Sequence, residues 1–166
     1  GEPRDVEAAV KAADFLLTEL RQPEGRLLHC WRRGTGKLEA YVDDYACMMN
    51  ALVSLYEATF DERWIDAAVE LAEALLSKFE DRQQGGFFFT SSDHETLIAR
   101  QKDLQDSSVP SGNAMAATAL VRLGKICGRM DFIDSAQRAM ESCLEIMQKA
   151  PTAAGQLLMA VDFLAG

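Results

Sequence analysis

The order in which charged and uncharged helices follow one another constrains the fold of this chain most. Apolar residues recur every three or four positions in six segments, which predicts helices over residues 5–20, 42–58, 62–80, 112–127, 131–149 and 153–165. The first, third and fifth segments carry charges along one face, whereas the second has none between Tyr45 and Tyr56. The fourth has none between Ala114 and Val121, and the sixth carries only Asp162. A helix that is apolar nearly all round is buried on most sides, so we expect exposed and buried helices to alternate.

A weak internal repeat supports this alternation. Residues 6–17 and 65–76 share six identities in twelve aligned positions, and a shift of 68 residues places the run 51–55 on the similar run 119–123. Repeated pairs of one buried and one exposed helix are typical of αα-hairpins wound about a common axis, with the buried helices inside. The predicted fold class is therefore all-α, built from αα-hairpins.

The connections between the predicted helices are unequal. Those at 59–61 and 128–130 are short, whereas those at 21–41 and 81–111 are long. Each long connection contains a strand-like run after a glycine, at 27–31 and at 87–90. Because successive helices alternate in direction, both long connections leave the bundle at the end where the buried helices begin. Long loops in compact domains usually have a role, so a functional site is expected at this end.

The polar and aromatic residues at the long-loop end are the candidates for chemistry. Aromatic rings can stack on the flat apolar face of a sugar, carboxylates can hydrogen-bond its hydroxyl groups, and paired carboxylates can hydrolyse a glycosidic bond. The candidate catalytic residues are Asp43, Asp44, Asp103 and Asp106. The candidate ligand-binding residues are Trp31, Tyr45, Phe88, Lys102, Ser111 and Asn113.

Several of these candidates also have a structural interpretation. Asp43 or Asp44 can cap a helix and favour its dipole, and Ser111 stands at an N-cap position. Lys102 and Asp103 can form an exposed ion pair, which contributes little to stability. The sequence leaves both interpretations open.

The histidines and cysteines form no catalytic or metal-binding motif. His29 and His94 are the only histidines and have no partner at catalytic spacing, which favours structural roles. The cysteines form no CxxC pair and share no metal-ligand spacing, so we expect them to be reduced, and we expect no metal site and no cofactor. They are Cys30, Cys47, Cys127 and Cys143. The run 87–89 is interpreted as a packed hairpin strand and 93–95 as an exposed loop tip.

Composition excludes several classes of protein. The chain has 26 acidic and 17 basic side chains, and its net charge of −9 argues against a nucleic-acid surface, where phosphates need clustered Lys and Arg. Hydrophobic residues make up 48% of the chain, too many for a disordered protein. No apolar run reaches the roughly 18 residues of a membrane span, and the charged first helix does not resemble a signal peptide. These features predict a cytoplasmic protein without nucleic-acid or membrane partners.

Five segments, in this order, resemble a known family. They are VDDYA at 42–46, LYEAT at 55–59, GGFFFT at 85–90, Lys102-Asp103 with Asp106, and PSGN at 110–113. The combination is similar to the C-terminal region of the thioredoxin-domain-containing proteins related to spermatogenesis-associated protein, the DUF255 family, and covers residues 6–164. Members of that family join a thioredoxin-like domain to an (α/α)6 toroid similar to those of N-acylglucosamine 2-epimerases and six-hairpin glycosidases.

The resemblance implies a partial toroid. Residues 1–166 are then a single domain of six helices, about half of an (α/α)6 toroid, with short β-hairpin strands in the long loops. The thioredoxin-like domain and the first half of the toroid are absent, so we interpret the chain as a fragment. The epimerases use histidines as acid and base, and neither His29 nor His94 lies on a predicted inner helix. The carboxylates of the glycosidases fit this chain better.

Two functional hypotheses follow from the resemblance. The first is carbohydrate binding or processing by the full-length protein, with no catalysis expected from this chain alone. The alternative is a non-enzymatic helical module that docks a thioredoxin-like domain or another partner. A partial ring exposes the apolar sides of its terminal helices, and large apolar patches rarely stay exposed, so we also expect self-association.

Overall fold

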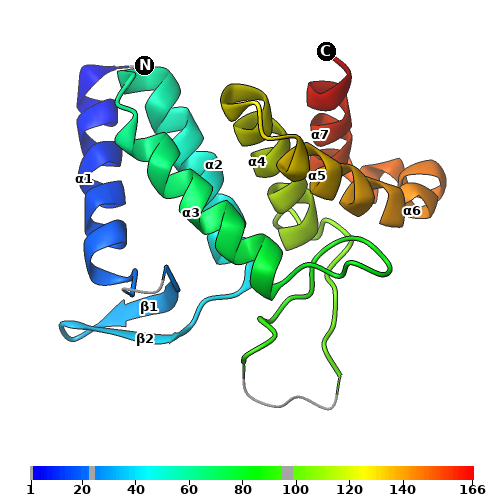
Figure 1. Cartoon of the computed structure of the whole chain (residues 1–166), viewed down its shortest axis with the longest axis horizontal. Coiled ribbons are helices and arrows are strands. Elements are labelled where there is room, and N and C mark those ends of the chain that lie inside the picture. Colours follow the sequence, from blue (N-terminus) through cyan, green and yellow to red (C-terminus); the bar gives the residue numbers. More distant parts are fainter. Residues whose placement is uncertain (1, 23–24, 95–98) are drawn as a thin grey trace.

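The computed structural model describes residues 2–22, 25–94 and 99–166, which are mostly helical (Figure 1). The longer helices are α1 (Pro3–Glu19), α2 (Val42–Thr59), α3 (Arg63–Lys78), α4 (Gly112–Cys127), α5 (Met130–Ser142) and α7 (Gly155–Ala165). Shorter ones are α6 (Leu144–Lys149) and the 3-10 turn η1 (Pro151–Ala153). Strands β1 (Leu28–Arg32) and β2 (Thr35–Glu39) form one antiparallel hairpin. The predicted helical class with a β-hairpin in a long loop is confirmed.

The helices form an inner and an outer layer, as their charge pattern predicts. Helix α4 packs between α2 and α7, while α3 packs on α2 and α5 packs on α4. Figure 1 shows α3 and α5 crossing in front of α2 and α4, with α1 and α7 on opposite sides of the molecule. The inner layer is therefore α2, α4 and α7, and the outer layer is α1, α3 and α5.

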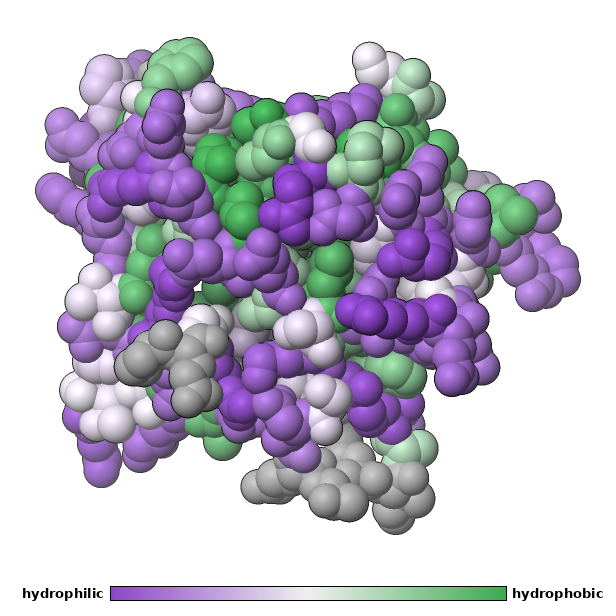
Figure 2. All heavy atoms as spheres, in the orientation of Figure 1, coloured by the Kyte–Doolittle hydropathy of each residue, from purple (hydrophilic) through white to green (hydrophobic). Residues whose placement is uncertain are grey.

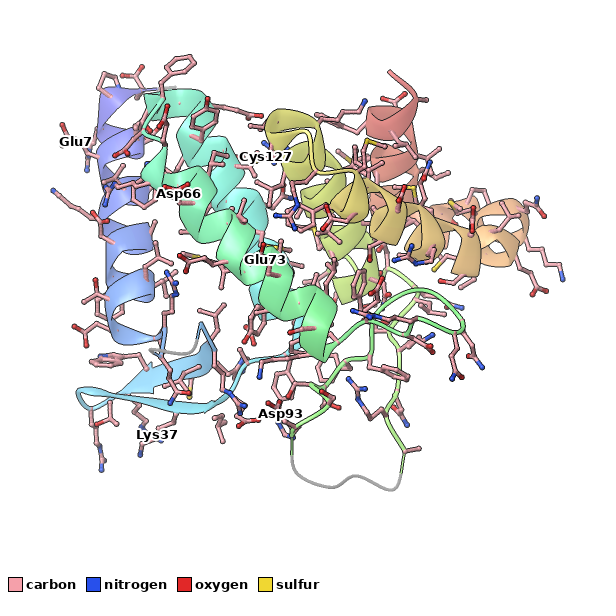
Figure 3. All side chains as sticks on the ribbon, in the orientation of Figure 1. Glu7, Lys37, Asp66, Glu73, Asp93 and Cys127 are labelled. Carbon is pink, nitrogen blue, oxygen red and sulfur yellow. The ribbon has the colours of Figure 1, made fainter. Side chains whose placement is uncertain are left out.

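The inner and outer helices differ in burial. Helix α4 buries eleven of its sixteen residues, many of them alanines that allow close approach of the neighbouring helices. Helix α3 instead carries polar side chains such as Asp66 and Glu73, labelled in Figure 3. Hydrophilic residues cover most of the face shown in Figure 2, where the outer helices lie in front. Within the described residues, no helix is both long enough and apolar enough to span a membrane.

The internal repeat is visible in the backbone. Helix α2 ends at Phe60 and α4 ends at Gly128, and both residues are left-handed, with φ of 56° and 67°. The two positions are 68 residues apart, the same shift that aligns the two inner helices in the sequence. The inner helix therefore ends in the same way in both hairpins, with a left-handed residue whose amide closes the last turn.

The second strand-like run does not form a strand. The run 27–31 supplies β1, whose hairpin turns at Arg33 and Gly34, both with positive φ. The run 87–90 makes only a single bridge, between Glu80 and Phe87. The N–H and C=O of Phe87 are both hydrogen-bonded to the side chain of Asn113, so they cannot join a ladder. The interpretation of 87–89 as a hairpin strand was wrong.

Two predicted helices have different bounds. The helix predicted at 131–149 is split at Cys143, whose amide bonds to carbonyls of the preceding turn, including that of Met140. The helix predicted at 153–165 begins at Gly155, after the 3-10 turn that starts at Pro151. The predicted burial of this last helix was also wrong. In α7 only Leu157 and Ala160 are buried, because the helix has an inner-layer neighbour on one side only.

Candidate functional site

Both long connections lie at one end of the bundle, as the sequence predicts (lower part of Figure 1). They contact each other there: the amide of Val42 donates to the carbonyl of Phe89, and Arg26 pairs with Asp93, which Figure 3 labels beside the second connection. Helices α2 and α4 begin side by side at this end. A Cβ on Gly112 would lie 2.6 Å from Val42 Cγ1, so only glycine permits this approach.

Asp44 forms a dyad with His29 at this end. Its Oδ2 accepts a hydrogen bond of 2.8 Å from the amide of Tyr41, and the same oxygen lies 2.8 Å from His29 Nδ1. Asp44 stands in the first turn of α2, whereas His29 comes from β1. Both side chains remain partly exposed, at 27% and 40%. The carboxylate thus orients an imidazole that can still reach a ligand.

Asp43 has a different environment from its neighbour. Its Oδ1 is buried and has no hydrogen-bond partner among the described residues. Burial raises the pKa of the Asp43 carboxyl, and the adjacent Asp44 raises it further. Two adjacent carboxyl groups therefore lie in unlike surroundings, one desolvated and the other hydrogen-bonded. Such a difference in environment is how active sites separate an acid from a base.

An aromatic wall stands beside the two aspartates. The ring of Tyr41 stacks on Phe89 at 4.6 Å between centroids and contacts the rings of both His29 and His94. The expectation that neither histidine has a partner was wrong for His29, which pairs with Asp44. Fifteen residues separate that pair in the sequence, and it forms only because the β1 hairpin folds back over α2. We refer to His29, Tyr41, Asp43, Asp44, Phe89 and His94 together as the rim cluster.

A cavity of about 320 Å³ adjoins the rim cluster between β1, α1 and α2. His29, Asp44 and Cys47 supply its polar wall, and the remainder is apolar. Burial raises the pKa of the Cys47 thiol, and Asp43 and Asp44 raise it further, so this cysteine stays protonated at neutral pH. The cavity therefore offers a carboxylate, an imidazole and a neutral thiol to a ligand.

Other candidates form a clamp that holds the second long connection. Asn113 is buried and accepts from the amide of Phe87, while its amide group donates to the carbonyls of Phe87 and Asp103. Lys102 lies 2.7 Å from both the carbonyl of Gly85 and a carboxylate oxygen of Asp81. The side chains of Asn113 and Lys102 are thus occupied by protein groups, whereas the Asp103 residue is exposed.

Asp106 and Ser111 connect this loop to two helices. The Asp106 carboxylate accepts from the amides of Ser111 and Gln156, which lie at the starts of α4 and α7. Ser111 caps α4 by accepting from the amide of Ala114. These contacts agree with the capping interpretation of Ser111, and they tie the second long connection to α7.

The aromatic candidates lie in three different places. Tyr45 is buried, and its hydroxyl accepts from the amide of Leu27. Trp31 packs edge-on against Phe15 of α1. Phe88 lies beneath the guanidinium of Arg100, 4.1 Å from the ring centroid. The structure therefore brings Asp43 and Asp44 into the rim cluster and distributes the other candidates over surrounding contacts.

Metal-ligating groups do not gather in the described part of the chain, where no set of three or more His, Cys, Asp or Glu could hold an ion. The four cysteines form no disulfide there. The predicted loop tip at 93–95 is only partly described, because Glu95 lies outside the described residues.

Acid is expected to weaken the second long connection. The hydrogen bond from Lys102 lowers the pKa of Asp81 to about 2, and the bond from Lys78 lowers that of Asp93 to about 2. Unfolded aspartate titrates near 3.9, so the stability from these pairs is fully present above about pH 4 and is lost as the pH falls toward 2. Urea unfolding at several pH values measures this loss.

The variant Asp81→Asn should show a shallower decrease in unfolding free energy over this pH range. Asp66→Asn, an exposed change on α3, serves as the control. An unchanged acid dependence in Asp81→Asn would show that the ion pair with Lys102 contributes nothing.

Comparison with known proteins agrees with the sequence resemblance. No family model matches the chain. It is 29% identical over 172 residues to spermatogenesis-associated protein 20 of Homo sapiens, an alignment that covers 98% of this chain and 22% of that protein. The chain is homologous to spermatogenesis-associated protein 20. The rat protein of that name is also 29% identical, over 95% of this chain and 21% of its own length. The chain thus spans about a fifth of the length of these relatives.

A solved structure confirms the fold. A GH76 alpha-mannanase of Bacteroides thetaiotaomicron superposes with a TM-score of 0.68 at 12% sequence identity, over 95% of this chain and 45% of that one. This chain therefore matches about half of an α/α-toroid glycosidase chain. The predicted resemblances to the spermatogenesis-associated protein family and to the six-hairpin glycosidase fold are confirmed.

Proposed function

We propose that the rim cluster is a carbohydrate site of the full-length protein. The observation that carries this proposal is the pairing of two adjacent carboxyl groups in unlike environments, at the start of an inner helix and beside an aromatic wall. Asp43, whose carboxyl pKa is raised by burial, is assigned as the proton donor, and the adjacent carboxyl group of Asp44, held by the amide of Tyr41 and by His29, is assigned as its partner. Glycoside hydrolysis needs one carboxyl group that donates a proton and a second that acts as base or nucleophile.

The aromatic wall supplies the binding surface. Phe89 stacks on Tyr41 and is still 36% exposed, so part of its ring is available to a ligand beside the carboxylates. The unpartnered Oδ1 of Asp43 lacks a hydrogen bond that a sugar hydroxyl or glycosidic oxygen would supply. The cavity of about 320 Å³ is within the size range of small-molecule sites.

A sugar titration tests binding by this chain. The probe is a panel of mono- and disaccharides that includes α-linked mannose, with the imidazole NMR signals of His29 and His94 as the readout. We expect a saturable shift of these signals, reduced by Tyr41→Ala and unchanged by Asp66→Asn on the outer helix α3. If no sugar in the panel shifts either histidine at millimolar concentration, the rim cluster is not a carbohydrate site.

Catalysis is tested in a full-length homologue. Replacing the aspartate that corresponds to Asp43 by asparagine preserves its shape but removes the transferable proton, and should lower kcat on a glycoside about 100-fold or more. The control changes the position that corresponds to Asp66. Equal activity of the two variants would contradict the proposed acid.

A further inference from the structure

The polar wall of the cavity beside the rim cluster consists mainly of hydrogen-bond acceptors. The hydrogen bonds that the described residues make with the Asp44 side chain all use Oδ2, which leaves Oδ1 of this partly exposed carboxylate to a ligand. A carboxylate accepts hydrogen bonds, so His29 Nδ1 is the donor to it, and Nε2 of the neutral imidazole is then an acceptor. The thiol of Cys47, the third polar group on this wall, is only a weak donor. The wall therefore suits a ligand that brings donors.

The carboxylate of Asp44 has no basic partner other than His29. In residues 2–22, 25–94 and 99–166, no ion pair joins it to a lysine or an arginine. Arg26 and Lys78 both pair instead with Asp93, which Figure 3 labels. The like charge of Asp44 also adds to burial in raising the pKa of the adjacent aspartate, Asp43, as an uncompensated carboxylate does to its neighbour. A cation bound at Asp44 would be attracted by this uncompensated charge.

The aromatic rings of the rim cluster favour a cation as well as a sugar. The face of an aromatic ring carries partial negative charge, and an ammonium group within about 6 Å of the ring centre is attracted to it. Tyr41 contacts the rings of His29, Phe89 and His94, and the Phe89 ring remains partly exposed. An aromatic surface beside a carboxylate can therefore receive the apolar side of a sugar and a positively charged substituent on it.

We propose that the ligand of the rim cluster is an amino sugar whose ammonium group binds at Asp44 Oδ1. This inference rests on the proposed carbohydrate function and narrows it to one chemical class. An ammonium group has three donors and no acceptor, which matches the acceptors on the cavity wall, whereas a hydroxyl group has a single donor. Hydrogen bonds between charged groups are also stronger than those between neutral ones. Asp43 does not contact the amine in this arrangement and remains available as the proposed acid.

Charge argues against an acidic sugar at the same place. A uronic acid would bring a third carboxylate beside Asp43 and Asp44, and like charges that share a site repel each other. The net charge of −9 also attracts cations and repels anions at long range. A neutral sugar can stack on the exposed ring, but only a sugar with an amine uses the charge of Asp44.

A set of matched sugars at pH 7 tests the proposal. It comprises glucosamine, glucose and N-acetylglucosamine, the three corresponding manno sugars, and glucuronate as the acidic member. Calorimetry gives the dissociation constants, and the NMR signals of His29 and His94 show whether the sugar binds at the rim cluster. We expect an amino sugar to bind about tenfold more tightly than its neutral counterparts at about 20 mM salt, and this ratio to fall at about 500 mM salt. Glucuronate should bind more weakly than glucose.

A pair of charge variants locates the preference for the amine. Asp44→Asn removes the charge and keeps the shape of the side chain, so the amino sugar should bind no more tightly than its neutral counterparts. Asp66→Asn removes the same charge from an exposed position on α3 and should keep the preference. The second variant controls for the net charge of the chain, and circular dichroism checks that both variants are folded.

The outcomes separate this inference from the proposed function. Neutral sugars or glucuronate that bind as tightly as the amino sugars would overturn the inference and leave the carbohydrate site standing. A preference for the amine that persists in Asp44→Asn would also overturn it. If no sugar of the set binds, the proposed function fails and the inference fails with it.

Discussion

Replacing Asn113 by alanine is expected to lower the free energy of unfolding by about 3 kcal/mol, because buried polar groups left without partners cost about 1–3 kcal/mol each. The change removes one acceptor and one donor group that together hold the amide and carbonyl of Phe87 and the carbonyl of Asp103. Asn113 is 1% exposed, so water cannot easily replace the lost bonds. Urea unfolding at pH 7 measures the difference.

A second variant at this position separates lost volume from lost hydrogen bonds. Asn113→Asp keeps the shape and can still accept from Phe87, but an ionised carboxylate cannot donate to the two carbonyls. Its loss at pH 7 should match or exceed that of the alanine variant. Gln105→Ala, an exposed change in the same connection, should change the unfolding free energy by less than about 0.5 kcal/mol. Equal effects of Asn113→Ala and Gln105→Ala would show that the clamp is not structural.

Gly85→Ala is expected to lower the unfolding free energy by about 2–4 kcal/mol, from backbone strain and overpacking together. Gly85 has a φ of +75°, and a Cβ there would lie 2.4 Å from the backbone carbonyl oxygen of Arg138. A backbone atom of a helix cannot move aside as the end of a flexible side chain can. The connection must therefore shift away from α5, and Lys102, which bonds to the Gly85 carbonyl, shifts with it.

Gly128→Ala is the matched control for that change. Gly128 has a similar φ of +67° but nothing within 4 Å of the added Cβ, so the variant should cost only about 1 kcal/mol from the left-handed backbone. The difference between the two variants isolates the contact with Arg138. If the unfolding free energy falls equally in both variants, the close approach of the second long connection to α5 does not contribute to stability.

The layers of the fold were predictable from charge alone. An exposed helix must keep its charged residues on one face, and an inner helix has no such face, so α2 and α4 were distinguishable from α3 and α5 in the sequence. The same logic failed for α7. Its apolar composition reflects the neighbours that a toroid provides, and in the described residues those neighbours cover only one side of the helix.

The rim cluster was only partly predictable. Asp43 and Asp44 could be located because they begin an inner helix at the long-loop end. The pairing of His29 with Asp44 depends on the path of an irregular connection, which leaves no periodic signal. Asn113 illustrates a different limit: a ligand-binding amide and an amide that clamps a backbone require the same residue type, so composition cannot separate them.

The two ends of the molecule differ in how much sequence change they can accept, because one end has only the short connections at Phe60 and Gly128 and the other has the two long connections. At the end of the molecule that carries these two turns, the chain reverses within three residues and contributes nothing to the rim cluster. At the opposite end, the two long connections supply four of the six rim residues: His29, Tyr41, Phe89 and His94. The ligand preference of the proposed carbohydrate site can therefore diverge among homologues by exchange of the two long connections, while the helices beneath them and the turns opposite remain the same.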